Sequence, residues 1–440
     1  MQLNILVATT CLLLACWLPT LTEAQESAKS RDRSEEDLAE IVDTLRQAVP
    51  FDNEVIPAGE TYLRVLQSAV TALYASDKLK RHRIEHERKW NAAREKHAVA
   101  AVPTTGSAFN CDVVRSHSPP TSVDKLRPAD IDVVGAIGDS LTAGMGIYSK
   151  NLLTIFTQYR GHSFTMGGKE DLSQHTTMPT VLKKFNPKLT GFSTGISGPD
   201  GIFAGFNEAV VGNRAEDMPR QARQLVEKMK KDKKVAFETD WKLINLFIGG
   251  NDVCDHCKDP SRFSVENYEK HIRTALDYLY DNVPRAFVNL IEMMDVAAVN
   301  DLKDQSLVCK ALLQTFWCKC GSTLSKEEVY EYSMELQRRA RRIAEDPKWT
   351  RKSDFTVVLQ PFLREITPPT LPNGEPDMAY FAPDCFHLSD KGHALGGLAL
   401  WNTMLEPVGK KRTDWVLNDR VNCPTEQRPY LATKGNSGSQ

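Results

Sequence analysis

After residue 24, the sequence lacks any apolar run long enough to cross a bilayer, which takes about 20 consecutive residues. It also lacks an excess of either charge, because 55 Lys and Arg residues are balanced by 57 Asp and Glu residues, for a formal net charge of -2. A nearly neutral chain has no long-range field that concentrates nucleic acid or another polyanion. Neither an Asn-x-Ser/Thr sequon nor an internal repeat is present. We therefore expect no transmembrane segment, no nucleic-acid partner and no N-glycosylation.

The first 24 residues have the pattern of a secretory signal peptide. An apolar run ends at Leu21 and is followed by Thr-Glu-Ala at residues 22–24, which is a plausible cleavage site. The run is shorter than a membrane span, and an uncleaved membrane anchor is the alternative. We predict that residues 1–24 are removed and that the mature protein is secreted.

Eight cysteines follow this segment, and an even number in an exported chain favours disulfides. Two close pairs, Cys254 with Cys257 and Cys318 with Cys320, leave a zinc site as the alternative, although their long separation fits no compact zinc module. We predict the bridges Cys385–Cys423 and Cys254–Cys257, so that the remaining four cysteines pair among themselves: Cys111, Cys309, Cys318 and Cys320.

Residues 25–105 form a predicted helical extension ahead of the main domain. Apolar residues at helical spacing between Leu38 and Leu45 predict one helix, and a second is expected from about residue 60 to residue 96. The first half of the second helix is amphipathic, and its second half is charged on nearly every face. We interpret the charged half as a solvated surface, with contact to lipid or heparin as the alternative. Residues 102–107 are typical of a linker.

From Cys111 onward, short apolar runs alternate with helical stretches. Strands are predicted at residues 133–137, 243–248, 286–290 and 355–359, and helices at 219–231, 265–280, 326–344 and 389–405. Strands that alternate with helices pair in parallel through right-handed crossovers. The predicted fold is therefore of the α/β class, a three-layer α/β/α sandwich with a parallel sheet. In such sheets the chemistry gathers at the carboxyl ends of the strands.

Polar signatures follow the first two predicted strands. Ser140 lies in Gly-Asp-Ser-Leu-Thr-Ala-Gly at residues 138–144, where a strand turns, but a serine hydroxyl needs a base to act as a nucleophile. Asn251 follows the next strand and can aim its amide N–H at a developing oxyanion. Asp384 and His387 lie three residues apart, a spacing that lets the carboxylate orient the imidazole toward the serine.

Together these blocks resemble the SGNH, or GDSL, hydrolase family. The four marker blocks occur in the family's order: Gly-Asp-Ser-Leu at 138–141, Asn-Glu-Ala-Val-Val-Gly at 207–212, Gly-Gly-Asn-Asp at 249–252 and Asp-Cys-Phe-His at 384–387. Three further stretches are most similar to the phospholipase B branch of animal enzymes: residues 125–130, 215–219 and 401–410. The resemblance covers about residues 111–425 and implies an SGNH hydrolase domain at 106–425. We expect the last residues, 426–440, to be a flexible tail.

The family resemblance also implies roles for individual residues. Ser140 would be the nucleophile, His387 the general base and then acid, and Asp384 the orienting carboxylate. The backbone N–H groups of Ser140 and Gly212 and the side chain of Asn251 would form the oxyanion hole. The resemblance implies no cofactor and no metal.

The expected function is that of a secreted phospholipase B or lysophospholipase, a serine esterase that forms an acyl-serine intermediate. Its partners would be a phospholipid or lysophospholipid substrate and, transiently, a lipid surface. No Gly-x-Ser-x-Gly elbow surrounds Ser140, which argues against a lipase of the α/β-hydrolase fold. Two alternatives stay open: a carbohydrate or small-ester deacetylase, because fold does not fix function, and a catalytically silent lipid- or partner-binding protein.

Overall fold

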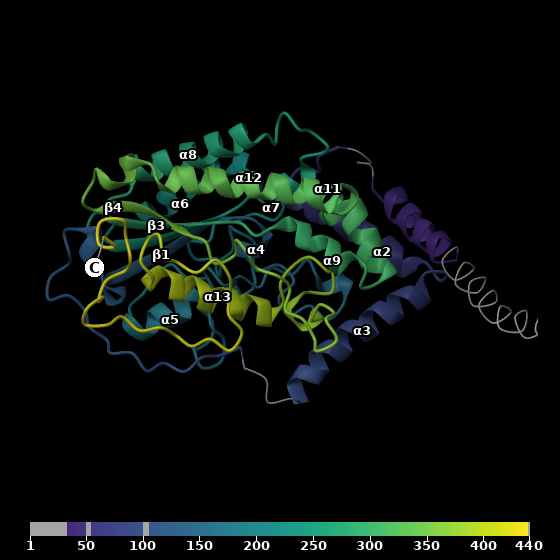
Figure 1. The fold of residues 1–440 in the computed structure, drawn as a ribbon, viewed down its shortest axis with the longest axis horizontal. Coiled ribbons are helices and arrows are strands. Elements are labelled where there is room, and N and C mark those ends of the chain that lie inside the picture. Colours follow the sequence, from purple (N-terminus) through teal and green to yellow (C-terminus); the bar gives the residue numbers. More distant parts are fainter. Residues whose placement is uncertain (1–32, 50–53, 100–104, 439–440) are drawn as a thin grey trace, which may run out of the picture.

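A computed structural model describes residues 33–49, 54–99 and 105–438 (Figure 1). The predicted signal peptide lies outside these residues. At the centre is a parallel sheet with the strand order β1-β2-β3-β4, formed by β1 (Ile131–Gly138), β2 (Trp241–Phe247), β3 (Ala286–Ile291) and β4 (Phe355–Gln360). Nearly every strand residue is buried, as expected for a parallel sheet that is covered on both faces.

Helices cover both faces of this sheet. One face carries the connecting helices α6 (Met218–Lys231), α8 (Val265–Asn282) and α12 (Lys326–Ala344), and the other carries α5 (Met178–Phe185) and α13 (Asp390–Leu405) (Figure 1). The strands β1 to β4 follow one another across the sheet in a single direction. Right-handed crossovers between them therefore place the three connecting helices on one face. The predicted three-layer α/β/α sandwich is confirmed, and each predicted strand and helix of the main domain overlaps an observed one.

The winding direction reverses at β1. Its free edge is met by two isolated parallel bridges, Val133 with Thr190 and Ala136 with Asn207. The chain reaches these bridges through α5, on the face opposite to the connecting helices. In open α/β sheets, ligands bind beyond the strand ends at such a reversal. The turn after β1, which leads into the short helix α4 (Ser140–Ala143), is therefore the expected location of a site.

Shorter helices fill the loops at this end of the sheet. They are α7 (Gly250–Asp255), α9 (Val299–Lys303), α10 (Leu307–Leu312) and α11 (Lys319–Thr323), with a π-helical turn at Leu313–Trp317. Within the described part of the chain, no helix is both long enough and apolar enough to span a membrane.

The described residues of the helical extension form three helices: residues 33–47, α2 (Glu60–Ala75) and α3 (Lys80–Val99). The prediction of one helix over residues 60–96 is wrong, because the backbone is extended at Ser76 and the chain turns there. The prediction of a solvated charged half is also wrong for one face of α3, since His86 and Trp90 are each only 1% exposed. In Figure 1, α2 and α3 lie at one end of the molecule, and α4 and α7 lie nearer its centre.

All eight cysteines of the main domain form disulfides, which excludes the zinc alternative in this structure. Both predicted bridges are wrong, since the pairs are Cys111–Cys423, Cys254–Cys318, Cys257–Cys320 and Cys309–Cys385. Cys385 lies just before α13, whereas Cys423 lies beside Trp401, whose indole N–H donates to the carbonyl of residue 422. The eleven helical steps from residue 390 to residue 401 span about 16 Å, so Cys385 and Cys423 lie near opposite ends of α13.

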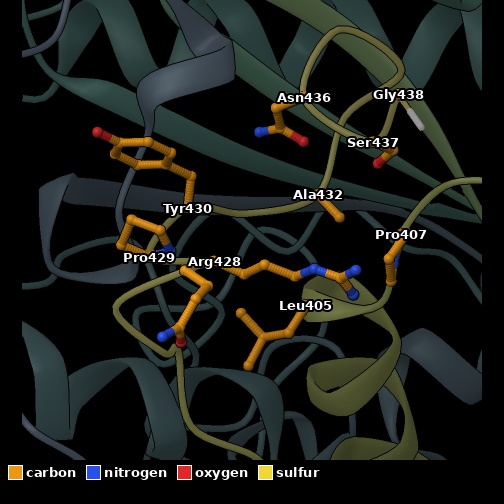
Figure 2. A pocket seen from close by; sticks show the side chains of 10 residues that line it. Leu405, Pro407, Arg428, Pro429, Tyr430, Ala432, Asn436, Ser437 and Gly438 are labelled. Atoms are coloured by element: carbon orange, nitrogen blue, oxygen red, sulfur yellow. The ribbon is translucent and has the colours of Figure 1, made fainter. Parts of the chain in front are cut away.

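Residues 426–438, the described part of the predicted flexible tail, pack against the body instead. Leu431 is fully buried and its N–H donates to the carbonyl of Leu126, while the N–H of Ala432 donates to the carbonyl of Met404. Figure 2 shows a pocket between this segment and the end of α13, lined by residues that include Leu405 and Tyr430. That pocket lies at the carboxyl end of α13, away from the turn after β1.

Candidate active site

Ser140 begins α4 directly after β1, in a turn that is held from several sides. The carboxylate of Asp139 caps the helix by accepting the N–H of Leu141 at 3.0 Å. Both backbone groups of Gly138 bond to the side-chain amide of Gln221, at 2.8 Å each. A Cβ atom at Gly138 would lie 2.5 Å from the carbonyl oxygen of Phe247, so only glycine fits there. These contacts fix where the serine hydroxyl is presented.

The structure brings Ser140, His387 and Asp384 into one hydrogen-bonded series. His387 Nε2 lies 2.8 Å from Ser140 Oγ, and His387 Nδ1 lies 2.5 Å from Asp384 Oδ2. The three side chains are at most 5% exposed. A carboxylate can only accept, so the proton of the imidazole is assigned to Nδ1, and Nε2 is left as the acceptor for the serine proton. The geometry is that of a nucleophile with its base and an orienting acid.

A tight turn holds Asp384 and His387 together. Cys385 has a positive φ of 63°, and the N–H of Ala382 donates to the carbonyl of His387 at 2.7 Å. Asp384 Oδ1 accepts the backbone N–H groups of Phe386 and His387. The Cys309–Cys385 disulfide anchors this turn to α10. His86 lies beside the disulfide, but bonded sulfurs are not thiolate ligands, so these three residues do not make a metal site.

The residues predicted for the oxyanion hole lie on two elements that meet beside Ser140. Gly212, with φ of 79°, lies on a loop whose Val210 N–H donates to the carbonyl of Gly138. Asn251 lies in α7 and its Nδ2 donates to the carbonyl of Asn213 at 2.8 Å. An amide nitrogen carries two hydrogens, so this bond orients the side chain and leaves one N–H for a ligand.

Two buried carboxyl groups next to these residues brace the site. Burial raises the pKa of Asp139 to about 6 and that of Asp252 to about 7. The carboxyl of Asp252 accepts the N–H of Ala215 at 3.1 Å and so ties α7 to the loop that follows Gly212. Both groups act as hydrogen-bond acceptors that shape their turns.

Two aromatic residues at the site were missed by the sequence analysis. The ring of Trp317 stands edge-on to the His387 ring, with centroids 5.4 Å apart, and its buried indole N–H has no partner among the described residues. The ring of Tyr62, from the helical extension, covers Gly212, since a Cβ atom there would lie 3.0 Å from it. Trp317 stands in an aromatic and cysteine-rich run that could have drawn notice, whereas Tyr62 is one of many residues on an amphipathic helix.

An apolar pocket adjoins the catalytic series. Three of its lining residues, Leu141, Gly250 and Phe386, are sequence neighbours of Ser140, Asn251 and His387. Most of the other lining side chains are hydrophobic, and they include Phe247, Met293, Met294, Ile366, Leu388 and Trp415. The pocket is a hydrophobic space that begins beside the nucleophile.

Comparisons with known proteins identify the family of the chain. The family model for GDSL-like lipase/acylhydrolase matches residues 134–400, which is more than half of the chain. The chain is 42% identical over 343 residues to human membrane-associated phospholipase B1 and 41% identical to the proteins of that name from Rattus norvegicus and Mus musculus. These alignments cover 76% of this chain and 24%, 24% and 23% of the relatives, so the chain spans about a quarter of their length.

One solved structure, of a proposed GDSL-like lipase from Parabacteroides merdae, aligns over 64% of this chain and 97% of its own. It shares 17% identity at a TM-score of 0.33, a likeness too weak to support conclusions. The match to the family model and the identity to the three relatives are sufficient on their own: the chain belongs to the GDSL-like lipase/acylhydrolase family.

Proposed function

We propose that this chain is a serine esterase that hydrolyses acyl esters of phospholipids or lysophospholipids. The observation that carries the proposal is the series Asp384, His387 and Ser140, in which the serine oxygen lies 2.8 Å from the ring nitrogen that is free to take its proton. A serine with such a base is activated for attack on an ester carbonyl. Membership of an acylhydrolase family supports the same reaction class.

The proposed reaction has two halves. Ser140 Oγ attacks the ester carbonyl while its proton passes to His387 Nε2, and the N–H groups of Ser140, Gly212 and Asn251 Nδ2 stabilise the oxyanion. The C–O bond then breaks, and His387 gives the proton to the leaving alcohol oxygen, which leaves an acyl-serine. In the second half, water gives a proton to His387 and attacks the acyl group. Collapse releases the fatty acid and returns the proton to Ser140.

The apolar pocket supports a long acyl chain as the group that is transferred. Burial of each CH₂ group contributes about 0.8 kcal/mol, so a fatty acyl chain would gain much more from this pocket than an acetyl group. The relatives named phospholipase B1 support a phospholipid as the source of that chain. We propose that this shorter chain acts on the same class of substrate and that it contacts a lipid surface transiently.

We also propose that the protein is secreted. Four disulfides require an oxidising compartment during folding, and the apolar pattern of residues 1–24 is typical of an export signal.

A substrate panel tests the proposed activity. Purified protein would be assayed with lysophosphatidylcholine, a long-chain phosphatidylcholine, p-nitrophenyl acetate and an acetylated sugar, with Ser140→Ala as the matched control. We expect release of fatty acid from the two lipids, covalent labelling by a fluorophosphonate probe, and loss of both in the variant. Turnover of acetyl esters without turnover of either lipid would favour a deacetylase. A folded wild-type protein with neither labelling nor turnover would favour a silent binding protein and would refute the proposal.

A further inference from the structure

Helix α3 of the extension lies against the loop that carries Asp384 and His387. His86 Nε2 lies 2.7 Å from the carbonyl oxygen of Pro383, and the Trp90 indole N–H donates to the carbonyl of Phe381 at 3.0 Å. The i, i+4 spacing of His86 and Trp90 places both side chains on one face of the helix. Each is 1% exposed, so these bonds are shielded from water. Pro383 directly precedes Asp384 in the chain.

The second ring nitrogen of His86 connects the same loop to α10. His86 Nδ1 lies 2.9 Å from Ser306 Oγ, which in turn caps α10 by accepting the N–H of Cys309 at 3.0 Å. A carbonyl can only accept, so the proton of the neutral ring is assigned to Nε2, and Nδ1 accepts the serine O–H. Burial lowers the pKa of His86 to about 4, which keeps the ring neutral near pH 7. The loop is thus held by His86 and, next to it, by the Cys309–Cys385 disulfide.

Helix α2 and the residues just ahead of it contact the other half of the site. The N–H of Gly59 donates to the carbonyl of Val211 at 2.9 Å, and the ring of Tyr62 lies over Gly212. Arg214 donates to the carbonyl of Ile56 at 3.3 Å. The extension therefore touches both the loop that carries the predicted oxyanion donor and the loop that carries the acid and base.

We infer that residues 54–95 belong to the catalytic unit and that His86 is a positioning residue, which holds the Pro383 carbonyl and thereby the carboxylate of Asp384. This inference rests on the proposed function for its kinetic consequences. A displacement of about 1 Å in such a group can cost about 10²-fold in rate. Removal of the extension would also leave the carbonyls of Pro383 and Phe381 without these donors, at about 1–3 kcal/mol each if they stayed buried. The extension is therefore no removable propeptide.

The test compares one substitution at two buried histidines. His86→Phe keeps a ring and removes the donor to Pro383. His175→Phe is the control, because His175 is likewise buried, at 2% exposed, and its Nε2 lies 3.0 Å from the carbonyl of His162, which is not part of the Asp384 loop. His86→Gln restores an N–H near the position of Nε2. Each variant would be measured for kcat and KM per fluorophosphonate-labelled site, for its kcat–pH profile and for its melting temperature.

We expect His86→Phe to lower kcat per labelled site at least about 10-fold, with KM changed less than about 3-fold, and to shift the acid limb of the pH profile. His86→Gln should recover part of kcat. His175→Phe should lower the melting temperature without a change in kcat per labelled site. An unchanged kcat in folded His86→Phe, or an equal loss in His175→Phe, would overturn the inference.

A second readout does not depend on turnover. The Nδ1 proton of His387, in its short bond to Asp384, should give a far-downfield proton NMR resonance that disappears in His387→Ala. That resonance should move in His86→Phe and stay in place in His175→Phe. If the wild-type protein were inactive on every ester, the proposed function would be refuted. The change in the His387 resonance would still show whether His86 positions Asp384. A resonance unmoved in both variants would refute that role.

Discussion

Substitution of Asn251 tests its role in the oxyanion hole through kcat, while the melting temperature reports separately on folding. Asn251→Ala removes the amide that we propose as an oxyanion donor, and it leaves the nucleophile, base and acid in place. Loss of one such donor costs about 10²–10³ in kcat, or about 2.7–4 kcal/mol of transition-state stabilisation. The substitution also removes the donor to the carbonyl of Asn213, which should cost about 1–3 kcal/mol of unfolding free energy.

Asn251→Asp should be worse than Asn251→Ala. It is nearly isosteric, but it places a negative charge where the oxyanion develops, and two charges about 4 Å apart repel by about 4 kcal/mol at an effective dielectric of about 20. The expected order of kcat is therefore wild type, then Asn251→Ala, then Asn251→Asp.

The assay is kcat and KM on one soluble ester, normalised to the amount of serine that a fluorophosphonate labels, with the melting temperature as the control for folding. The loss should fall on kcat and leave KM nearly unchanged, because the donor acts on charge that is present only in the transition state. A folded Asn251→Ala protein with wild-type kcat, or an Asn251→Asp protein more active than the alanine variant, would remove Asn251 from the oxyanion hole.

Three further predictions concern the frame around the site. Gly138→Ala should lower both the melting temperature and kcat, because the new Cβ would meet the carbonyl of Phe247 at 2.5 Å and overpacking costs about 1–3 kcal/mol; unchanged thermal unfolding would contradict this. Burial raises the pKa of Asp252 from 3.8 to about 7, so the native state keeps the carboxyl proton at pH values where the unfolded chain has lost it. The free energy of unfolding should therefore fall by on the order of 4 kcal/mol through this one group as the pH rises from about 4 to 7. Asp252→Asn should flatten that fall in denaturant titrations at several pH values, and an identical pH dependence would refute the assignment. Replacing both Cys309 and Cys385 with Ser should destabilise the protein by about 2–4 kcal/mol and lower kcat. Both quantities would be measured after mass spectrometry confirms the other three bridges. A kcat equal to that of the wild type would show that the catalytic turn does not need this disulfide.

The sheet could be predicted because each strand is a continuous apolar run, of the kind that a strand covered on both faces requires. The residues at the site could be found for a different reason. Ser140, Asn251 and the pair Asp384 and His387 each lie in a short local block. The first two blocks follow β1 and β2 directly, and the third lies between β4 and α13.

What could not be predicted depends on contacts between distant parts of the chain. Cysteine spacing does not encode which loops meet, so the two bridges that join the segment around the end of α7 to the start of α11, Cys254–Cys318 and Cys257–Cys320, were missed. The run around His86 is rich in Lys, Arg and Glu and contains neither Gly nor Pro, so it favours one long solvated helix. The break at Ser76 and the burial of His86 arise from packing on the main domain, which no local pattern reports.

The bridge between Cys111 and Cys423 joins residues 312 positions apart. It closes nearly the whole hydrolase domain into a covalent ring. A protease that cuts any one exposed loop between those two cysteines therefore releases no fragment, and the strands keep their neighbours as long as the bridge is oxidised. For the secreted enzyme proposed above, a single cut between those two cysteines would leave both pieces covalently joined, and reduction of the bridge would remove that link.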